Sequence, residues 1–249
     1  GRVSRHGAMT LAWSLDKIGP MCRTAEDCAV VLNEICGPDG RDASAADMPF
    51  EWNDSLDVRT FVVGYVEEEF AATMESVGDR ARVNRNLYRA ALDTLRSMGV
   101  RLVPVTLPHI PAGLTEFVMS CEASAAFDYL NAGMTELAEA KGVPNYRAAR
   151  FVPATEYCQA NRLRTLLMRE MDTLMAGLDA YVTPTFVGPT NWLTNLTGHP
   201  EMIVPCGFTD KGMPAAISFV GKLYGEAAIT SLARAFQRAN PGVPFPAAL

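Results

Sequence analysis

Three polar side chains near the start of the chain, His6, Ser14 and Asp16, are of the types that form a hydrolytic triad. In a triad the histidine takes the serine proton, and the carboxylate orients the imidazole. Ser14 could instead pair with Lys17, provided that burial lowers the pKa of that amine enough for it to act as a base. Loop residues of these types more often stabilise turns, so both arrangements are hypotheses that depend on distances in space.

Other motifs of hydrolytic and metal chemistry are missing from the sequence. The nucleophile elbow G-x-S-x-G does not occur, and no glycine-rich run could cradle a phosphate or an oxyanion. The six cysteines are widely spread without a C-x-x-C pair, and the three histidines lie far apart. We therefore expect neither a metal site nor a cofactor. Each cysteine lies in an apolar stretch, which predicts buried free thiols in a reducing, cytoplasmic compartment.

Composition and charge argue against two classes of protein. The 249 residues carry a net charge of −6, and their 22 lysines and arginines form no basic cluster, so a nucleic-acid-binding protein is not expected. No apolar run reaches the roughly 18 residues of a membrane span, so no membrane partner is expected either. An apolar content of 49% with 20% charged residues is typical of a globular protein with a sizeable core.

The elements that must position any site alternate between helices and strands. Thr24 and Asp27 form a capping box before an apolar-periodic run, which predicts a helix closed by Gly37. Around Gly99 a helix, a glycine and a strand follow one another, which is the order of an α/β crossover. The other patterns predict strands at 61–66, 100–106, 181–183, 201–206 and 215–220, and helices at 77–98, 114–140, 154–176 and 225–239.

This alternation predicts an α/β protein with a mixed β-sheet flanked by helices. Neither an internal repeat nor a low-complexity linker interrupts the pattern, so residues 1–249 are expected to form a single unit. The acidic run from Glu67 to Glu69 follows the first predicted strand and is expected to be a solvated loop. In the loop before another strand, Asn195 either holds the backbone or contacts a ligand, and His199 is expected to be packed.

Several segments, taken in order, resemble the C-terminal half of the amidase signature family. They are GRVSRHG, SLDKIGPMCRTAEDCAVVLNEICGPDGRD, ATEYCQANRLRTLL, DAYVTPT, NLTGHPEMIVPCGF and GMPAAISFVGKLYGE, and they span nearly the whole chain. The resemblance implies hydrolysis of an amide C–N bond by a lysine, a bridging serine and a nucleophilic serine. In the family these residues precede the GRVSR-like segment. Gly1 is therefore expected to lie just downstream of the catalytic core, and the isolated chain to be inactive.

The resemblance also implies which residues border the pocket. SLDKIGPM and NLTGHP match family loops beside the active site, and Trp192 could contact an apolar acyl group, although packing in the core is its alternative role. One further position lies on the helix that begins with a Glu-Ala-Ser run. The pocket candidates are Asp16, Met21, Tyr129, Trp192, Asn195 and His199.

The family's amidotransferase members grip the glutamine carboxylate with an arginine on that helix. Here Glu122-Ala-Ser124 is present, but the matching position holds Tyr129, and residues 187–196 contain no acidic side chain for the amino group. A buried zwitterion would lack both charge partners. We therefore expect a general amidase acting on a small-molecule amide. The alternative is the glutamine-hydrolysing subunit of a tRNA-dependent amidotransferase.

A non-enzymatic function is a further alternative. The chain could be a non-catalytic binding or interaction module on the same scaffold, which would bind a ligand without turning it over. If the family's central sheet runs through both halves, this half exposes a strand edge and an apolar face. Self-association of the chain is then expected.

Overall fold

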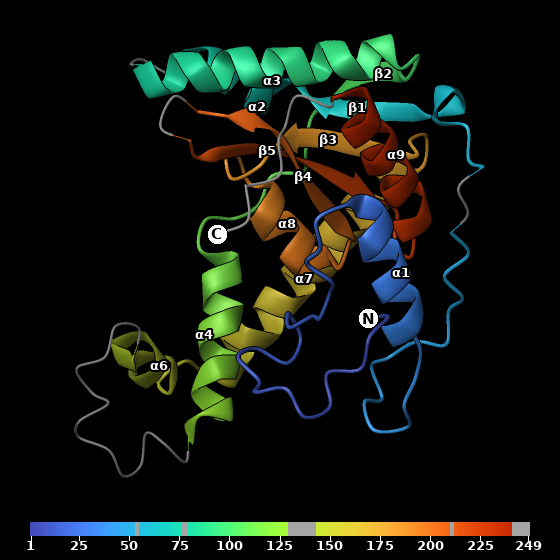
Figure 1. Ribbon diagram of the computed structural model, residues 1–249. Coiled ribbons are helices and arrows are strands. Elements are labelled where there is room, and N and C mark those ends of the chain that lie inside the picture. The colour runs from blue at the N-terminus through green and yellow to red at the C-terminus, as the bar shows by residue number, and fades with distance from the viewer. Residues whose placement is uncertain (53–54, 76–78, 129–142, 210–211, 241–249) are drawn as a thin grey trace.

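The structure of the protein, a computed structural model, describes residues 1–52, 55–75, 79–128, 143–209 and 212–240. Its centre is a five-stranded sheet with the strand order β2-β1-β3-β5-β4 (Figure 1). β1 (Val62–Val66) lies parallel to β2 (Arg101–Val105) and to β3 (Ala180–Pro184). β5 (Pro214–Gly221) runs antiparallel to both β3 and β4 (Glu201–Phe208). The expected mixed sheet of an α/β protein is therefore confirmed.

One face of the sheet is covered by α3 (Asp79–Ser97) and α9 (Glu226–Ala239) (Figure 1). Their apolar side chains meet those of the strands in one core, where the ring of Phe219 lies edge-on to that of Phe236 with centroids 5.9 Å apart. α1 (Ala25–Ile35) packs beside α9. The predicted start of α1 is confirmed, because the Thr24 hydroxyl accepts the N–H of Asp27 at 3.0 Å.

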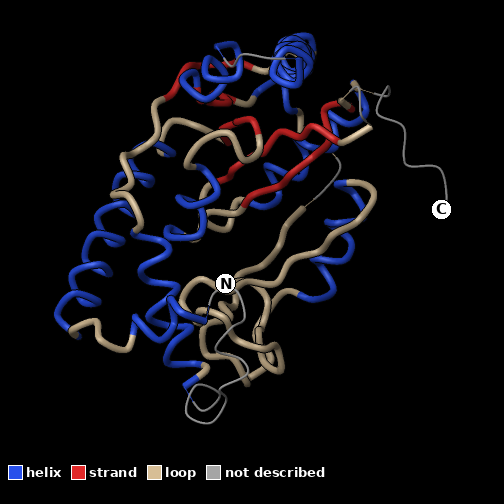
Figure 2. The backbone as a smooth tube through the Cα atoms, turned by 90° about the vertical axis from the view of Figure 1, so that its left-hand side faces the viewer, coloured by secondary structure: helices blue, strands red, loops and turns tan. Residues whose placement is uncertain are grey.

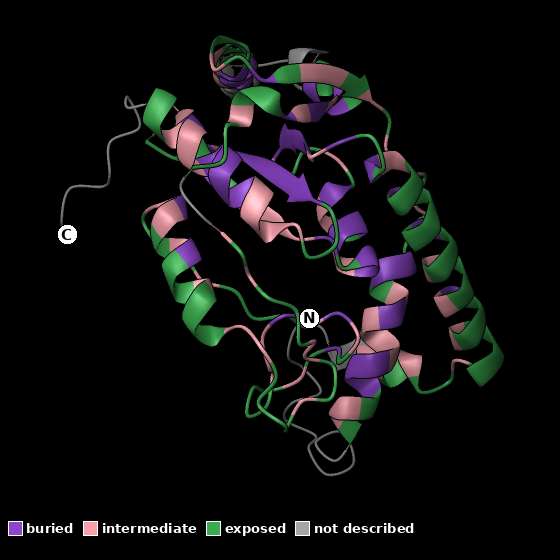
Figure 3. Cartoon of the chain, turned by 90° about the vertical axis from the view of Figure 1, so that its right-hand side faces the viewer, coloured by how far each residue is buried: buried purple, intermediate pink, exposed green. Residues whose placement is uncertain are grey.

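The other face is covered by α4 (Leu114–Ala126), α7 (Ala154–Met175) and α8 (Thr190–Thr197). Tyr181 packs on this side, whereas its neighbour Val182 belongs to the core under α3 and α9. All five residues of β3 are buried, and Figure 3 shows the central part of the sheet as buried. Burial on both faces explains why the inner strands β1 and β3 are apolar without alternation.

The expectation of a solvated acidic loop is wrong. The run begins α2 (Glu67–Glu75), directly after β1, and Glu69 is only 5% exposed. Its carboxylate accepts hydrogen bonds from the hydroxyls of Thr183 and, at 3.4 Å, Thr190, and burial raises its pKa. Three carboxylates in a first turn suit the positive end of a helix dipole, so the run marks a helix start.

Two further expectations about local structure need correction. Asn195, expected in a loop, lies in α8 (Thr190–Thr197), and Gly198 ends this helix in the left-handed conformation with φ 81°. Because α8 is short, its apolar residues complete only two turns and give little periodic signal. The helix predicted for 114–140 ends at Ala126, and residues 129–142 lie outside the described ranges.

The cysteines are less buried than expected. All six are free, but only Cys206 is buried, whereas Cys22 and Cys158 are exposed. Cys158 lies on the face of α7 that is turned to solvent, so an apolar neighbourhood in sequence does not mean burial here.

Two short helices, η1 (Val58–Thr60) before β1 and α6 (Val143–Ala149) against α4, complete the described elements. Over the described ranges, none of the helices combines the length and apolar character that a membrane span requires.

Candidate functional site

The segment before α1 runs as loop (Figure 2), and the side chain of Asp16 shapes its main turn. The carboxylate accepts the N–H of Leu11 at 2.9 Å and of Ala12 at 3.1 Å. The N–H groups of Leu15 and Asp16 both reach the Ala12 carbonyl at 2.8 Å. The pocket candidate Asp16 is therefore engaged by local backbone, which is the usual role of aspartate in a turn.

Ser14, on the same turn, meets charged side chains from two helices. Its hydroxyl donates to Oε1 of Glu122 at 2.6 Å, and its N–H donates to Oε2 at 2.8 Å. Arg164 of α7 donates from Nη1 to the Ser14 hydroxyl at 2.7 Å and from Nη2 to the Ser14 carbonyl at 2.8 Å. The Tyr157 hydroxyl donates to Glu122 Oε1 at 2.8 Å. These four residues are referred to below as the anchor cluster.

The anchor cluster satisfies a carboxylate that has no access to water. Glu122 is 0% exposed, and an unpaired charge there would be strongly destabilising. Burial lowers the pKa of Arg164, an effect that the negative charge of Glu122 opposes. Burial raises the pKa of the Tyr157 hydroxyl, and its hydrogen bond to Glu122 adds to that rise. The cluster therefore fastens the turn to α4 and α7 through mutually dependent groups.

The two segments expected to border the site meet at Lys17. Its Nζ donates to Oδ1 of Asn195 in α8 and, at 3.1 Å, to the Leu15 carbonyl. Asn195 in turn donates from Nδ2 to the Asn191 carbonyl at 2.7 Å, so its amide is fixed on the helix. Arg164 adds a second link by donating from Nε to the Leu196 carbonyl at 2.5 Å. Asn195 is therefore a helical residue that contacts the turn, and it does not hold a loop.

The ammonium group of Lys17 has a lowered pKa. The main cause is the loss of hydration among neighbouring protein atoms, and Arg164 adds to it, while Glu201 and Asp16 act in the opposite direction. A lowered pKa favours a base, but Lys17 bonds to Asn195 and a carbonyl. Among the described residues, the Ser14 hydroxyl bonds to Glu122 and Arg164 and to neither Lys17 nor His6. The structure therefore supports neither the triad nor the Ser-Lys dyad.

An open depression of about 360 Å³ lies beside this turn. His6, Asp16 and Lys17 line it together with the half-exposed ring of Trp13. Cations and carboxylates share its wall, so a polar small molecule could find both donors and acceptors there. Of the sequence-predicted pocket residues that the structure describes, only Asp16 lines this depression, and Asn195 reaches its edge through Lys17.

The remaining pocket candidates do not gather at the turn. Met21 is 99% exposed, and Trp192 on α8 is 42% exposed, so core packing does not account for either side chain. His199 is buried, with Nδ1 2.9 Å from the Thr197 hydroxyl, and burial lowers its pKa. Its expected role as a packed residue is confirmed. Tyr129 lies outside the described residues.

Sequence reasoning named Glu122 only as part of a Glu-Ala-Ser run, and it predicted neither its contacts nor those of Arg164. Glu122 carried a usable signal, because a carboxylate beside Ala123 on an apolar helix must find a partner once it is buried. Arg164 carried none, since α7 has several arginines and only the fold decides which of them faces inward.

The sheet and its helices have the fold of amidase signature enzymes. An amidase family protein from Bacillus anthracis superposes with a TM-score of 0.78 at 20% identity, covering 100% of this chain and 53% of that one. A glutamyl-tRNA(Gln) amidotransferase chain from Thermotoga maritima gives 0.76 at 22% identity, covering 99% and 59%. The peptide amidase from Stenotrophomonas maltophilia gives 0.75 at 24% identity, covering 99% and 57%.

The sequence agrees with the fold. The family model described as Amidase matches residues 1–191, so the chain belongs to the amidase family. A subunit of the glutamyl-tRNA(Gln) amidotransferase from Roseiflexus sp. (strain RS-1) is 30% identical over 285 aligned positions, which cover 96% of this chain and 57% of that protein. The corresponding protein from Myxococcus xanthus is 29% identical over 286 positions, covering 96% and 58%. This chain therefore spans less than two thirds of the length of these relatives.

Proposed function

We propose that this chain forms the C-terminal part of an amidase signature hydrolase. The enzyme cleaves the C–N bond of a small-molecule amide to give an acid and ammonia or an amine. The observation that carries the proposal is the hydrogen bond from Lys17 to Asn195, because it joins the two segments that match the loops bordering the active site. The family match over residues 1–191 supports the same conclusion.

In this proposal the catalytic lysine and both serines come from a segment that precedes residue 1. The neutral lysine takes a proton through the bridging hydroxyl, and the second serine attacks the amide carbonyl. Backbone N–H groups of that segment stabilise the oxyanion. This chain contributes a pocket wall made of the turn at residues 14–17 and α8, and the enzyme acts in the cytoplasm. No residue of the chain is assigned a catalytic role.

The glutamine-hydrolysing component of a tRNA-dependent amidotransferase is a second candidate, favoured by the names of the relatives. Against it stand Tyr129, where the resemblance calls for an arginine, and the absence of an acidic residue from the sequence 187–196. Without those charges the glutamine zwitterion would be poorly held. A general amide substrate is therefore the better fit.

The experiment compares this chain with the complete product of the reading frame that contains it, using ammonia release as the readout. We expect no hydrolysis by the chain alone, and hydrolysis of simple aliphatic or aryl amides faster than glutamine by the complete product. A clear preference for glutamine would favour the amidotransferase. Ligand binding without turnover would favour a binding module. Hydrolysis by the chain alone would overturn the proposed location of the catalytic residues.

A further inference from the structure

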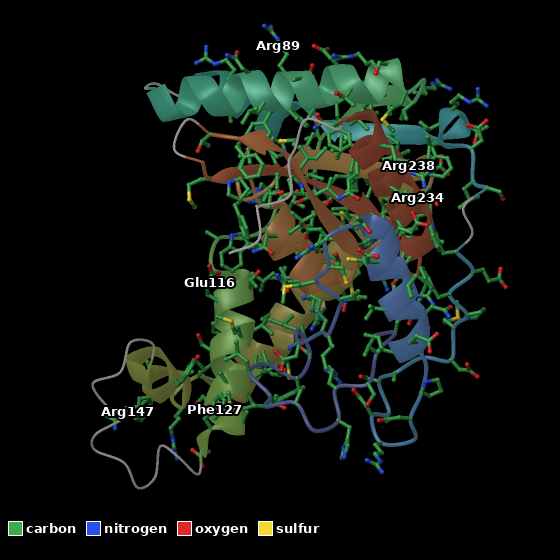
Figure 4. The ribbon with its side chains drawn as sticks, in the orientation of Figure 1. Arg89, Glu116, Phe127, Arg147, Arg234 and Arg238 are labelled. Atoms are coloured by element: carbon green, nitrogen blue, oxygen red, sulfur yellow. The ribbon has the colours of Figure 1, made fainter. Side chains whose placement is uncertain are left out.

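A second depression, of about 320 Å³, lies on the side of the sheet that α3 and α9 cover, whereas the anchor cluster lies on the other side. Its walls are η1, Met98 after α3, and one face of α9. The α9 residues Ser231, Arg234, Ala235 and Arg238 line it together because helical residues three, four and seven apart share a face. Figure 4 shows Arg234 and Arg238 on α9, in the right-hand half of the molecule.

Arginine side chains give this depression a positive character. Among the described residues that line it, Arg59, Arg234 and Arg238 are accompanied by a single carboxylate, that of Asp57, in a chain whose net charge is −6. Arg59 pairs with Asp57 at 2.7 Å, while one oxygen of Glu26 accepts from Arg234 at 3.0 Å and from Arg238 at 3.5 Å. The Arg238 contact is long and its side chain is exposed, so that guanidinium can turn towards a ligand.

The depression also has an apolar wall and a fixed cation. Leu56, Val58 and Met98 present hydrocarbon beside the arginines. The Arg234 guanidinium lies 5.7 Å from the centroid of the Trp52 ring, a cation–π contact that restricts its position. A ligand that fits has an anionic end and an apolar end.

We propose that this depression binds a small organic phosphate. The phosphate contacts the guanidinium groups of Arg59, Arg234 and Arg238, whose planar N–H pairs match phosphate oxygens in bidentate geometry. The organic group packs against the apolar wall. A volume of about 320 Å³ lies near the lower end of small-molecule sites, which suits a phosphate monoester with one ring. This inference does not depend on the proposed hydrolase function.

The test is calorimetric titration of this chain with phenyl phosphate, inorganic phosphate, benzoate and phenol at about pH 7.5, where a phosphate monoester carries close to two charges. Phenyl phosphate is expected to bind most tightly, inorganic phosphate and benzoate more weakly, and phenol not at all. Added salt is expected to weaken the binding of phenyl phosphate.

The variant Arg238→Glu is expected to weaken phenyl phosphate binding at least about tenfold, because it reverses a charge at the exposed rim. Arg89→Glu makes the same charge change on the exposed face of α3 (Figure 4) and is expected to leave the affinity unchanged. Arg59→Glu is a second variant at an exposed position, and circular dichroism verifies the fold of each. The proposal is overturned if phenyl phosphate does not bind, if phenol or inorganic phosphate binds equally well, or if both Arg238→Glu and Arg59→Glu bind like the parent.

Discussion

The ammonium group of Lys17 and the amide oxygen of Asn195 are hydrogen-bonded although 178 residues separate them in the sequence. A second connection to α8 runs through Arg164, which donates hydrogen bonds to the Leu196 carbonyl and to the Ser14 hydroxyl. Turn and helix are thus joined twice, once directly and once through α7. This segment without regular secondary structure is consequently held in a fixed position against α7 and α8.

Replacing Lys17 by methionine tests the direct link. The variant keeps the alkyl chain but removes the donor, so we expect the free energy of unfolding to fall by about 1 kcal/mol. Lys222→Met, at another exposed lysine, is the control and is expected to change little. Urea denaturation of both variants gives the comparison, and an equal loss in the two would contradict a specific role for the Lys17 contact.

Replacing Glu122 by glutamine tests the anchor cluster. The amide has the same shape but leaves Arg164 without its carboxylate neighbour and gives Ser14 a weaker acceptor, so a loss of about 3 kcal/mol in unfolding free energy is expected. Glu116→Gln is the matched control, because Glu116 lies on the same helix but is exposed (Figure 4). Hydrogen exchange at the Leu11 and Ala12 amides is expected to accelerate in Glu122→Gln only. Unchanged protection of those amides would show that the turn is held by other means.

The buried carboxylate of Glu69 predicts a pH dependence of stability. Burial raises its pKa above the ordinary value of 4.5, so the folded chain binds this proton more tightly than the unfolded chain. The stability from Glu69 is therefore fully present below about pH 4.5 and is lost as the pH rises through the raised pKa. Glu69→Gln cannot ionise, so the decline in unfolding free energy towards neutral pH is expected to become shallower. Denaturant midpoints from about pH 4 to pH 7 measure this, with the exposed Glu67→Gln as the control that keeps the parent slope.

Gly188 is expected to tolerate no side chain. A Cβ atom there would lie 2.2 Å from the Cδ and Oε1 atoms of Glu69, closer than real contacts allow. Gly188→Ala must displace Glu69 from its threonine partners and should lower the unfolding free energy by about 1–3 kcal/mol. Thermal melts of the variants measure this loss. Gly177→Ala is the control, because its added methyl group lies in open space. An unchanged unfolding free energy in Gly188→Ala would show that α2 can shift to make room for the methyl group.

We propose that isolated chains associate through β4, which is an edge strand of the sheet in the described ranges. Ile203 on this strand is 50% exposed, and an open edge with an apolar residue favours strand pairing between copies. Light scattering should show a mass that rises with concentration, and Ile203→Lys should shift the population to monomer. Met213→Lys, at an exposed position before β5, is the control. A parent chain that stays monomeric at every concentration would rule this association out.

The inner strands β1 and β3 were predictable because they are largely buried on both faces and read as apolar runs. β3 ends at Pro184 as expected, and β1, β4 and β5 lie within a residue or two of their predicted bounds. The burial of Glu69 at the acidic start of α2 was not predictable, because a dense run of charges usually indicates exposure. The carboxylate of Glu69 is held by threonine hydroxyls that arrive from β3 and α8, more than a hundred residues away.

The candidate site was predictable only in outline. The resemblance pointed to the turn and to the region of Asn195, and the structure brings both together. It gave no reason to expect Arg164, which is the residue that links them. The link by Arg164 depends on which face of α7 packs inward. Contacts between residues far apart in the sequence determine that face.

The long sequence separations in the anchor cluster set an order of assembly. Ser14 must wait for Glu122, 108 residues later, and for Arg164, 150 residues later, before its hydrogen bonds can form. Lys17 must wait longer still for Asn195. On a ribosome the turn at residues 14–17 therefore emerges before its partners, and all of its contacts are in place only after α8 has left the exit tunnel. Until then the polar groups of this turn stay exposed to water, chaperones and proteases, although the turn lies near the centre of the network of contacts in the folded chain.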